Sequence, residues 1–215
     1  AHDISVEMLM EQGYLSPVIS KGGLNQIDLT GVGKRGGEFI ESQLATAASD
    51  PELVAATVNE IVELGEDRKS WLIFSSGIKH ARMLLEEFES HGISVDAVTG
   101  EDSKKVRDQT IADFKSGKLR CLINVNVLTT GFDHPAVDLI GLIRATASTG
   151  LYVQMVGRGT RIADGKENCL VCDFGANVER HGFIDKVNPN YKTSSGDGDA
   201  PVKKCEKCQT MVHAA

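Results

Sequence analysis

Two kinds of hydrophobic pattern alternate along most of the chain. Apolar residues at helical spacing predict helices, and unbroken apolar runs of strand length predict buried strands. Helices are expected over 50–65, 78–92, 103–117 and 149–158, and strands over 71–74, 93–98, 119–125, 137–143 and 168–173. Strands that alternate with helices over short connections indicate a parallel sheet that is covered by helices on both faces. The sequence therefore predicts an α/β domain.

The two ends of the chain depart from this pattern. Residues 1–48 contain many glycines and few long apolar runs, so they resemble a lead-in to the domain more than a second core. The polar stretch 193–199 is typical of a flexible linker. We therefore expect a lead-in over 1–48, the α/β domain over 49–190, and a linker with a short tail over 191–215.

Composition and charge narrow the class of protein. The chain is 41% hydrophobic and 25% charged, as soluble globular proteins are, and carries a formal charge of −7. A strongly basic nucleic-acid-binding module is disfavoured, although a local basic groove would escape this count. No apolar stretch is long enough for a membrane span, no export signal opens the chain, and five cysteines do not indicate a disulfide framework. We expect a cytoplasmic protein.

The segment 154–161, Gln-Met-Val-Gly-Arg-Gly-Thr-Arg, carries the strongest chemical signal. Arg158 and Arg161 stand three residues apart, on neighbouring points of one helical face, and their planar groups suit phosphate oxygens. Gly157 permits close backbone approach, and the amide of Gln154 can hold a water or a phosphate. A solvated basic face is the alternative for the arginines alone.

A second candidate motif follows the apolar run that ends near residue 128. It contains Thr129, Thr130, Gly131 and Asp133, in a loop at the carboxyl end of a predicted strand. Open α/β sheets bind ligands at such ends. Taken alone, these residues are equally compatible with an ordinary turn.

Together the two motifs resemble motifs V and VI of superfamily 2 helicases. Residues 72–81 stand where motif IV of that family belongs, and Val98-Thr99-Gly100 followed by Arg107 resembles its next element. The resemblance covers about residues 70–185 and implies the second RecA-like domain, with a mostly parallel sheet flanked by helices. It also implies that the lead-in comes from a first motor domain.

Further segments look like the bacterial RadD (YejH)-type group, DEAD/DEAH-like proteins related to the helicase subunits of restriction enzymes. These segments are 11–17, 142–148, 173–175 and 180–185.

The resemblance implies an ATP site that also needs Mg²⁺ and the first RecA-like domain. It implies that Arg158 and Arg161 act as arginine fingers, which stabilise charge in phosphoryl transfer, and that Gln154 places the attacking water. The residues that it places beside the nucleotide are Gly131, Asp133 and Gly157.

The resemblance also implies contacts with the sugar-phosphate backbone, which position a strand without reading its sequence. The residues concerned are Ser75, Ser76, Lys79, Thr99, Gly100, Thr129 and Thr130. The expected function is that of an ATP-dependent helicase or translocase on single- or double-stranded nucleic acid, with DNA and DNA repair favoured over RNA. The alternative is a RecA-like docking or nucleic-acid-binding module without its own ATPase cycle.

Two parts of a complete ATPase are not found in the sequence. The segment 31–35, Gly-Val-Gly-Lys-Arg, lacks the spacing of a phosphate-binding loop, and no buried strand is predicted before it. No acidic box that would hold Mg²⁺ occurs either. In the helicase family both parts belong to the first domain, so we expect the isolated chain to hydrolyse no ATP.

The cysteines fall into two groups. Cys169 and Cys172 lie three apart on a predicted strand and therefore point to opposite faces, and Cys121 is expected in the core. Cys205 and Cys208 lie in the polar tail at the spacing of a zinc ribbon. Tetrahedral zinc takes four ligands, so we expect this pair to be half of a zinc ribbon, with His213 as a candidate third ligand.

Overall fold

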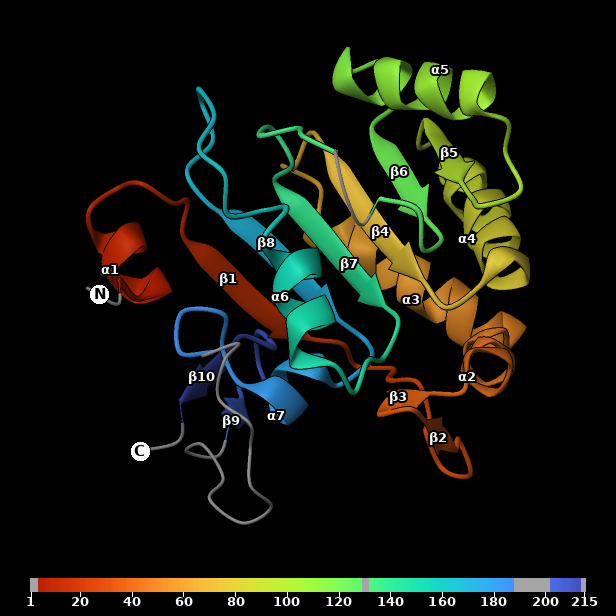
Figure 1. The fold of residues 1–215 in the computed structure, drawn as a ribbon, viewed down its shortest axis with the longest axis horizontal. Helices are drawn as coiled ribbons and strands as arrows, with labels where there is room; N and C mark the ends of the chain where they lie inside the picture. The colour runs from red at the N-terminus through yellow and green to blue at the C-terminus, as the bar shows by residue number, and fades with distance from the viewer. Residues whose placement is uncertain (1–3, 129–131, 188–201, 214–215) are drawn as a thin grey trace.

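The computed structural model describes residues 4–128, 132–187 and 202–213. Its centre is a six-stranded parallel sheet with the strand order β1–β8–β7–β4–β6–β5 (Figure 1). The strands are β1 (Val18–Gly22), β4 (Trp71–Ser75), β5 (Val95–Val98), β6 (Cys121–Asn124), β7 (Leu139–Ile143) and β8 (Cys169–Asp173). The predicted α/β architecture is confirmed.

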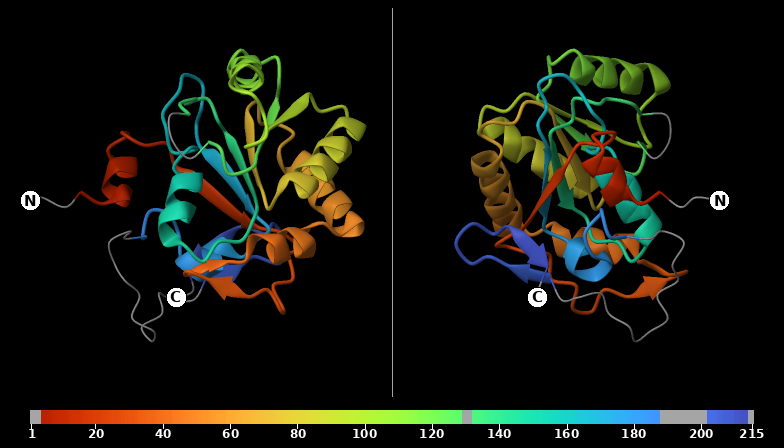
Figure 2. Two further views of the ribbon diagram at one scale, coloured as in Figure 1. Left: turned by 45° about the vertical axis from the view of Figure 1, so that its right-hand side comes forward. Right: turned by 90° about the vertical axis from the view of Figure 1, so that its left-hand side faces the viewer.

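Helices cover both faces of the sheet (Figure 2). The helices on one face are α2 (Glu41–Ala48), α3 (Pro51–Leu64) and α4 (Ile78–Ser90), and those on the other are α5 (Lys104–Lys115), α6 (Thr149–Val156) and α7 (Asn177–His181). A short helix α1 (Val6–Glu11) precedes β1. Two hairpins complete the fold, β2 (Lys34–Arg35) with β3 (Glu38–Phe39) and β9 (Val202–Lys204) with β10 (Met211–His213). Within the described residues, no helix is long and apolar enough to span a membrane.

The helices begin and end largely where the sequence predicts. Asp50 caps α3 by accepting a hydrogen bond from the Leu53 backbone at 2.9 Å, and Ser103 caps α5 in the same way. One boundary differs, because α6 ends at Val156 with Gly157 as its C-cap and does not continue to residue 158. The low helix propensity of glycine accounts for the early end.

The central strands are buried on both faces, which explains their unbroken apolar runs. Trp71 and Cys121 are fully buried in the core beneath α3 and α4. Cys169 packs into the core on the α6 face and Cys172 into the core on the opposite face. The expected opposite orientation of these two thiols is confirmed.

Part of the expected lead-in is built into the same sheet. Residues 18–22 form the edge strand β1, which pairs with β8, and Leu44 and Ala48 of α2 are buried in the core. The hydrophobic pattern does not reveal β1, because an edge strand exposes alternate residues and its apolar run is only two residues long.

One arginine joins the end of α3 to the start of the sheet. The Arg120 guanidinium lies over the ring of Trp71, 4.3 Å from its centroid. It donates to the carbonyl oxygens of Gly65 at 2.9 Å, Glu66 at 2.9 Å and Arg68 at 2.6 Å. These carbonyls follow the last turn of α3, where backbone acceptors lack helical partners.

We expect Arg120→Ala to lower the free energy of unfolding by about 2–3 kcal/mol, because several backbone acceptors lose a charged donor. Urea denaturation followed by circular dichroism measures this change. Arg82→Ala is the matched control, since Arg82 is exposed on α4 and should change stability by less than about 0.5 kcal/mol. Equal effects of the two substitutions would contradict the assignment.

Candidate functional site

The chain leaves β6 through a turn that one asparagine holds. The side-chain oxygen of Asn124 is buried and accepts hydrogen bonds from the backbone of Val127 at 3.1 Å and of Leu128 at 2.9 Å. Asn126 lies within this turn, just before Val127, and has a φ of 59°. This is a left-handed conformation that asparagine tolerates better than most residues. The connection from β6 to β7 is therefore fixed at its start by side-chain chemistry.

Helix α6 carries the second motif and is anchored by its own apolar face. Its N-cap Ser148 accepts from the Leu151 backbone at 3.2 Å, while Tyr152 and Met155 are buried. After Gly157 the chain turns, so Arg158 and Arg161 project from this turn and not from the helix.

Arg158 and Arg161 both reach the connection that follows β6. The Arg158 guanidinium donates to the carbonyl oxygens of Phe132 at 2.5 Å and Leu128 at 3.2 Å. The Arg161 guanidinium donates to the same Phe132 carbonyl at 3.3 Å and forms an ion pair with Asp133. The structure therefore brings together two arginines and an aspartate that the sequence assigns to one site.

Two further residues fix the turn that carries the arginines. The Lys166 ammonium donates to the carbonyl oxygens of Gly159 at 2.7 Å, Arg161 at 2.8 Å and Pro135 at 3.1 Å. A Cβ at Gly159 would lie 2.3 Å from the sulfur of Cys169, so only glycine permits this approach to β8. Sequence reasoning missed Lys166 and this contact of Gly159, while the close approach expected at Gly157 stays a prediction.

Positive charge exceeds negative charge around the two arginines. Burial lowers the pKa of Arg158 and the neighbouring Arg161 lowers it further, while Asp133 opposes both effects. The Asp133 side chain is 71% exposed, so its ion pair with Arg161 contributes about 0–1 kcal/mol. A phosphate can therefore replace Asp133 at little cost and gain a bidentate contact.

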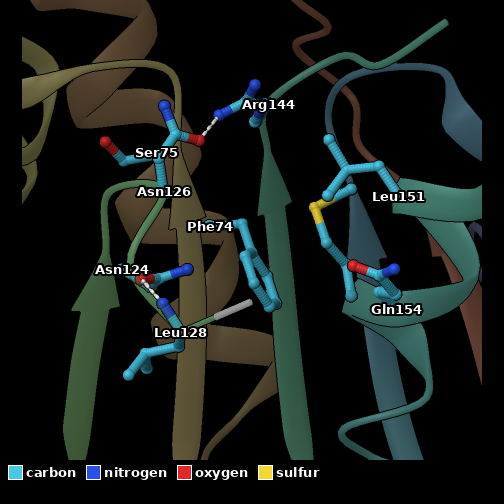
Figure 3. Close-up of a pocket in the computed structure, with 9 residues that line it drawn as sticks. Phe74, Ser75, Asn124, Asn126, Leu128, Arg144, Leu151 and Gln154 are labelled. Atoms are coloured by element: carbon cyan, nitrogen blue, oxygen red, sulfur yellow. Dashed lines mark hydrogen bonds between the residues drawn. The ribbon is translucent and has the colours of Figure 1, made fainter. Parts of the chain in front are cut away.

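Gln154 lies at a small pocket where β4, β6 and β7 end (Figure 3). The lining is largely apolar, and the polar side chains of Asn126, Arg144 and Gln154 also contribute to it. Its volume of about 20 Å³ is enough for a water molecule but not for a nucleotide. The role of Gln154 in placing the attacking water stays a prediction.

The residues implied for nucleic-acid contacts differ in their surroundings. Ser75 and Ser76 are buried, and their hydroxyl groups donate within the protein, to the carbonyls of Gly77 and Ile143 at 2.9 Å each. These serines therefore shape the turn into α4, where Lys79 is exposed.

The remaining implied contacts follow β5 and β6 in the sequence. Thr99 is half-buried and Gly100 is exposed after β5. Thr129, Thr130 and Gly131 lie outside the described residues. The nucleic-acid contacts therefore stay predictions.

A carboxylate from the β2–β3 hairpin holds the turn between β7 and α6. Glu38 accepts hydrogen bonds from the backbone of Ala147 at 2.8 Å and Ser148 at 3.3 Å and from the Thr146 hydroxyl. Burial alone would raise the pKa of Glu38, but these hydrogen bonds and the charge of Arg144 outweigh burial, so the pKa is lowered. No periodicity or motif marks Glu38, which sequence reasoning missed.

A buried aspartate at the end of β8 also holds the turn between β7 and α6, through Asn177. Asp173 accepts from the backbone of Val178 at 2.7 Å and from the side chain of Asn177 at 2.9 Å, and Asn177 in turn bonds to the backbone of Thr146 and Arg144. Burial raises the pKa of Asp173 to about 6. This network sets the position of Arg144 beside the pocket.

The tail forms a compact turn around its two cysteines. Cys205 and Cys208 lie between β9 and β10, and Gln209 follows with a φ of 61°. Hydrogen bonding to Thr210 lowers the pKa of Cys208 to about 7. No group of three metal-ligating side chains occurs in the part of the chain that the structure describes.

The chain matches a known family and several known proteins in sequence. The family described as the helicase conserved C-terminal domain matches residues 53–163. IRC3 of Saccharomyces cerevisiae, assigned as an ATP-dependent helicase, is 31% identical over 151 residues, which make up 69% of this chain and 22% of IRC3. The ATP-dependent RNA helicase ROK1 of the same yeast is 32% identical over 122 residues, 57% of this chain and 22% of ROK1.

A solved structure extends the likeness over more of the fold. A fragment assigned as the HsdR subunit of a type I restriction enzyme from Vibrio vulnificus YJ016 aligns with 88% of this chain and 37% of its own, with a TM-score of 0.64 and 20% identity. At this identity the likeness shows the fold alone. The chain spans about a fifth of the length of IRC3 and of ROK1.

We expect Glu38→Gln to destabilise the chain by about 1 kcal/mol at neutral pH, a value kept small by partial exposure to water. The folded pKa of Glu38 lies below its ordinary value of 4.5, so its contribution is present above pH 4.5 and is lost as the pH falls through the folded pKa. The stability difference between wild type and Glu38→Gln should therefore shrink below pH 4.5.

Urea denaturation at several pH values measures this difference. Glu89→Gln, exposed at the end of α4, is the control and should show no such pH dependence. A difference for Glu38→Gln that stays constant down to low pH would contradict the role of its ionised form.

Proposed function

Because the chain belongs to the helicase conserved C-terminal domain family, we propose that it is the second motor domain of an ATP-dependent helicase or translocase. The observation that carries this proposal is the convergence of Arg158 and Arg161 on the Phe132 carbonyl. This contact joins the two motifs that in such enzymes face a nucleotide.

The arginine pair would act across a cleft on ATP held by the first motor domain. Bound ATP with Mg²⁺ would supply the transferred phosphoryl group, whose charge spreads in the transition state. Arg161 is held by an exposed aspartate and can turn toward that charge, while Arg158 also holds the β6–β7 connection in place. Gln154 would place the attacking water, with Gly131, Asp133 and Gly157 near the nucleotide. The two guanidinium groups fit a phosphate, and the Mg²⁺ ligands would come from the first domain.

The nucleic acid would lie along the edge where the parallel strands end. Lys79 and Gly100 are exposed there, and the turns that contain Ser75, Ser76 and Thr99 shape this edge. The resemblance adds Thr129 and Thr130 to these contacts. Resemblance to the RadD-type group favours DNA and a role in DNA repair, whereas ROK1 is named for RNA. The cysteine pattern favours a cytoplasmic location. ATPase stimulation by matched DNA and RNA strands separates the two substrates.

We expect Arg158→Lys and Arg161→Lys each to lower nucleic-acid-stimulated ATP turnover of the complete helicase by at least about tenfold, or 1.4 kcal/mol. Lysine keeps the charge but loses the planar fork that meets two phosphate oxygens. Steady-state ATPase assays measure this loss. Arg82→Lys, exposed on α4, is the matched control and should keep full turnover.

The 215-residue chain alone should show no ATP turnover above background. Full turnover in both arginine variants of the complete helicase would overturn the assignment. It would then favour a docking or nucleic-acid-binding module without an ATPase cycle.

The cysteine pair of the tail would supply two of four ligands to a structural zinc ion. We expect the complete protein to bind about one zinc per chain and Cys208→Ser to lose it, because two thiolates and two further ligands are needed. Metal analysis after dialysis measures the zinc content. Glu206→Ala, which changes an exposed residue between the cysteines, should keep the zinc. Full zinc in Cys208→Ser would place the ligands elsewhere.

A further inference from the structure

The β2–β3 hairpin is a short projection that the two helicase motifs do not use. Its turn consists of Gly36 and Gly37, both with positive φ, 63° and 84°, as a two-residue hairpin turn requires. Lys34 and Arg35 form its first strand, and both are exposed. In Figure 1 the hairpin extends beyond the point where the sheet strands end.

The base of the hairpin is fixed to the domain. An isolated two-stranded hairpin is marginally stable in water, and here Glu38 anchors it to the turn that precedes α6. Phe39 contacts two cations: the Lys34 ammonium lies 5.0 Å and the Arg180 guanidinium 5.2 Å from its ring centroid. The projection is therefore held in place, although only a few residues form it.

The hairpin stands at the edge proposed for nucleic acid. Glu41, two residues after β3, accepts a hydrogen bond at 2.7 Å from Asn126, which follows β6. A Cβ at Gly77, before α4, would lie 3.1 Å from Ala45 of α2. The hairpin and α2 are thus packed against the ends of β4, β6 and β7, on the side where Lys79 is exposed.

The exposed charge of the hairpin is unbalanced. Among the described residues, neither Lys34 nor Arg35 takes part in an ion pair. Glu38, the acidic residue of the hairpin, accepts hydrogen bonds from the backbone of Ala147 and Ser148. These cations belong to the first 70 residues, which otherwise carry a strong excess of negative charge. The segment already has ample charge of the opposite sign for solubility, so two fixed cations are not needed for that purpose. Their positions suit binding of a polyanion.

We propose that the β2–β3 hairpin is a phosphate-binding arm, in which Lys34 and Arg35 contact the sugar-phosphate backbone of the nucleic acid that lies along the sheet edge. This proposal rests on the proposed function and extends the contact surface beyond the helicase motifs. A Cβ at Gly36 or Gly37 would meet nothing within 4 Å, so the turn leaves room for a backbone to approach. The contact is electrostatic and independent of base sequence.

The test is the salt dependence of binding between the 215-residue chain and a labelled single-stranded oligonucleotide. Each phosphate contact to a single strand contributes about 0.7 to the slope of log K against log salt. Lys34→Gln with Arg35→Gln should therefore lower the magnitude of the slope by about 1.4, and Arg35→Gln alone by about 0.7. Arg35→Lys should keep the slope. Fluorescence anisotropy at several salt concentrations measures it.

The matched control removes the same charge from the opposite edge of the sheet. Lys69 precedes β4 and is exposed, and like Arg35 it takes part in no ion pair among the described residues. Lys69→Gln, the match for Arg35→Gln, should leave the slope unchanged if the hairpin makes direct contacts. Unchanged thermal unfolding of Arg35→Gln shows that the fold is kept, because Arg35, unlike Lys34, does not pack on Phe39.

The outcomes separate this proposal from the proposed function. An unchanged slope in the hairpin variants, or an equal loss in the control, overturns the phosphate-binding arm. If Lys79→Gln lowers the slope while the hairpin variants do not, the arm alone is wrong. If the wild-type chain shows no salt-dependent binding, the phosphate-binding arm is wrong, whereas the proposed function is decided by the arginine variants of the complete helicase. Binding of an acidic protein in place of nucleic acid would also overturn the arm.

Discussion

The backbone carbonyl of Phe132 organises the arginine site. It accepts hydrogen bonds from both Arg158 and Arg161, although these residues follow α6 and the carbonyl belongs to the β6–β7 connection. A buried or half-buried carbonyl needs a donor, and charged donors give the stronger hydrogen bonds. Satisfying this acceptor therefore sets the position of both guanidinium groups before any ligand arrives. The geometry of the site follows from backbone chemistry as much as from the arginines.

The all-parallel sheet supplies the rigid support for this contact. Its central strands are buried on both faces, so their order and register are fixed by packing against α3 and α4 on one side and α6 on the other. Tyr152 and Met155 hold α6 on the sheet, while Gly159 permits the following turn to touch Cys169 of β8. A small shift of this turn would move both arginines together. Close packing thus positions charges that are themselves only half-buried.

Much of this arrangement can be predicted from the sequence, because periodicity reports burial. The runs at 71–75 and 139–143 are apolar since both faces of their strands are covered, and Asp50 and Ser103 mark helix starts by local chemistry. The pairing of the two helicase motifs also follows from their order along the chain. The motifs alone do not predict that Arg158 donates to the Phe132 carbonyl or that Arg161 pairs with Asp133.

Other parts depend on contacts between residues distant in sequence, which no local pattern reveals. Strand β1 is half-exposed, so its residues do not form a long apolar run. Glu38 acts on a turn more than 100 residues away, at Ala147. Lys166 donates to three backbone carbonyls, although it lies in a polar loop that carries no recognisable motif. These contacts are tertiary, and they determine where the predicted residues stand.

Parallel strands also impose a path on the β6–β7 connection that links the two proposed binding regions. Because β6 and β7 both run in the same direction on either side of β4, the chain between them must cross from the carboxyl edge to the amino edge. Asn124 holds this connection where it leaves the edge proposed for nucleic acid, and Arg158 holds it near Phe132. One covalent segment is therefore fixed at one end by the strand edge and at the other by the arginine site. Under the proposed function, the nucleic acid would contact the start of this segment and the nucleotide would draw on Arg158, which holds it near Phe132, so both ligands would touch the same connection.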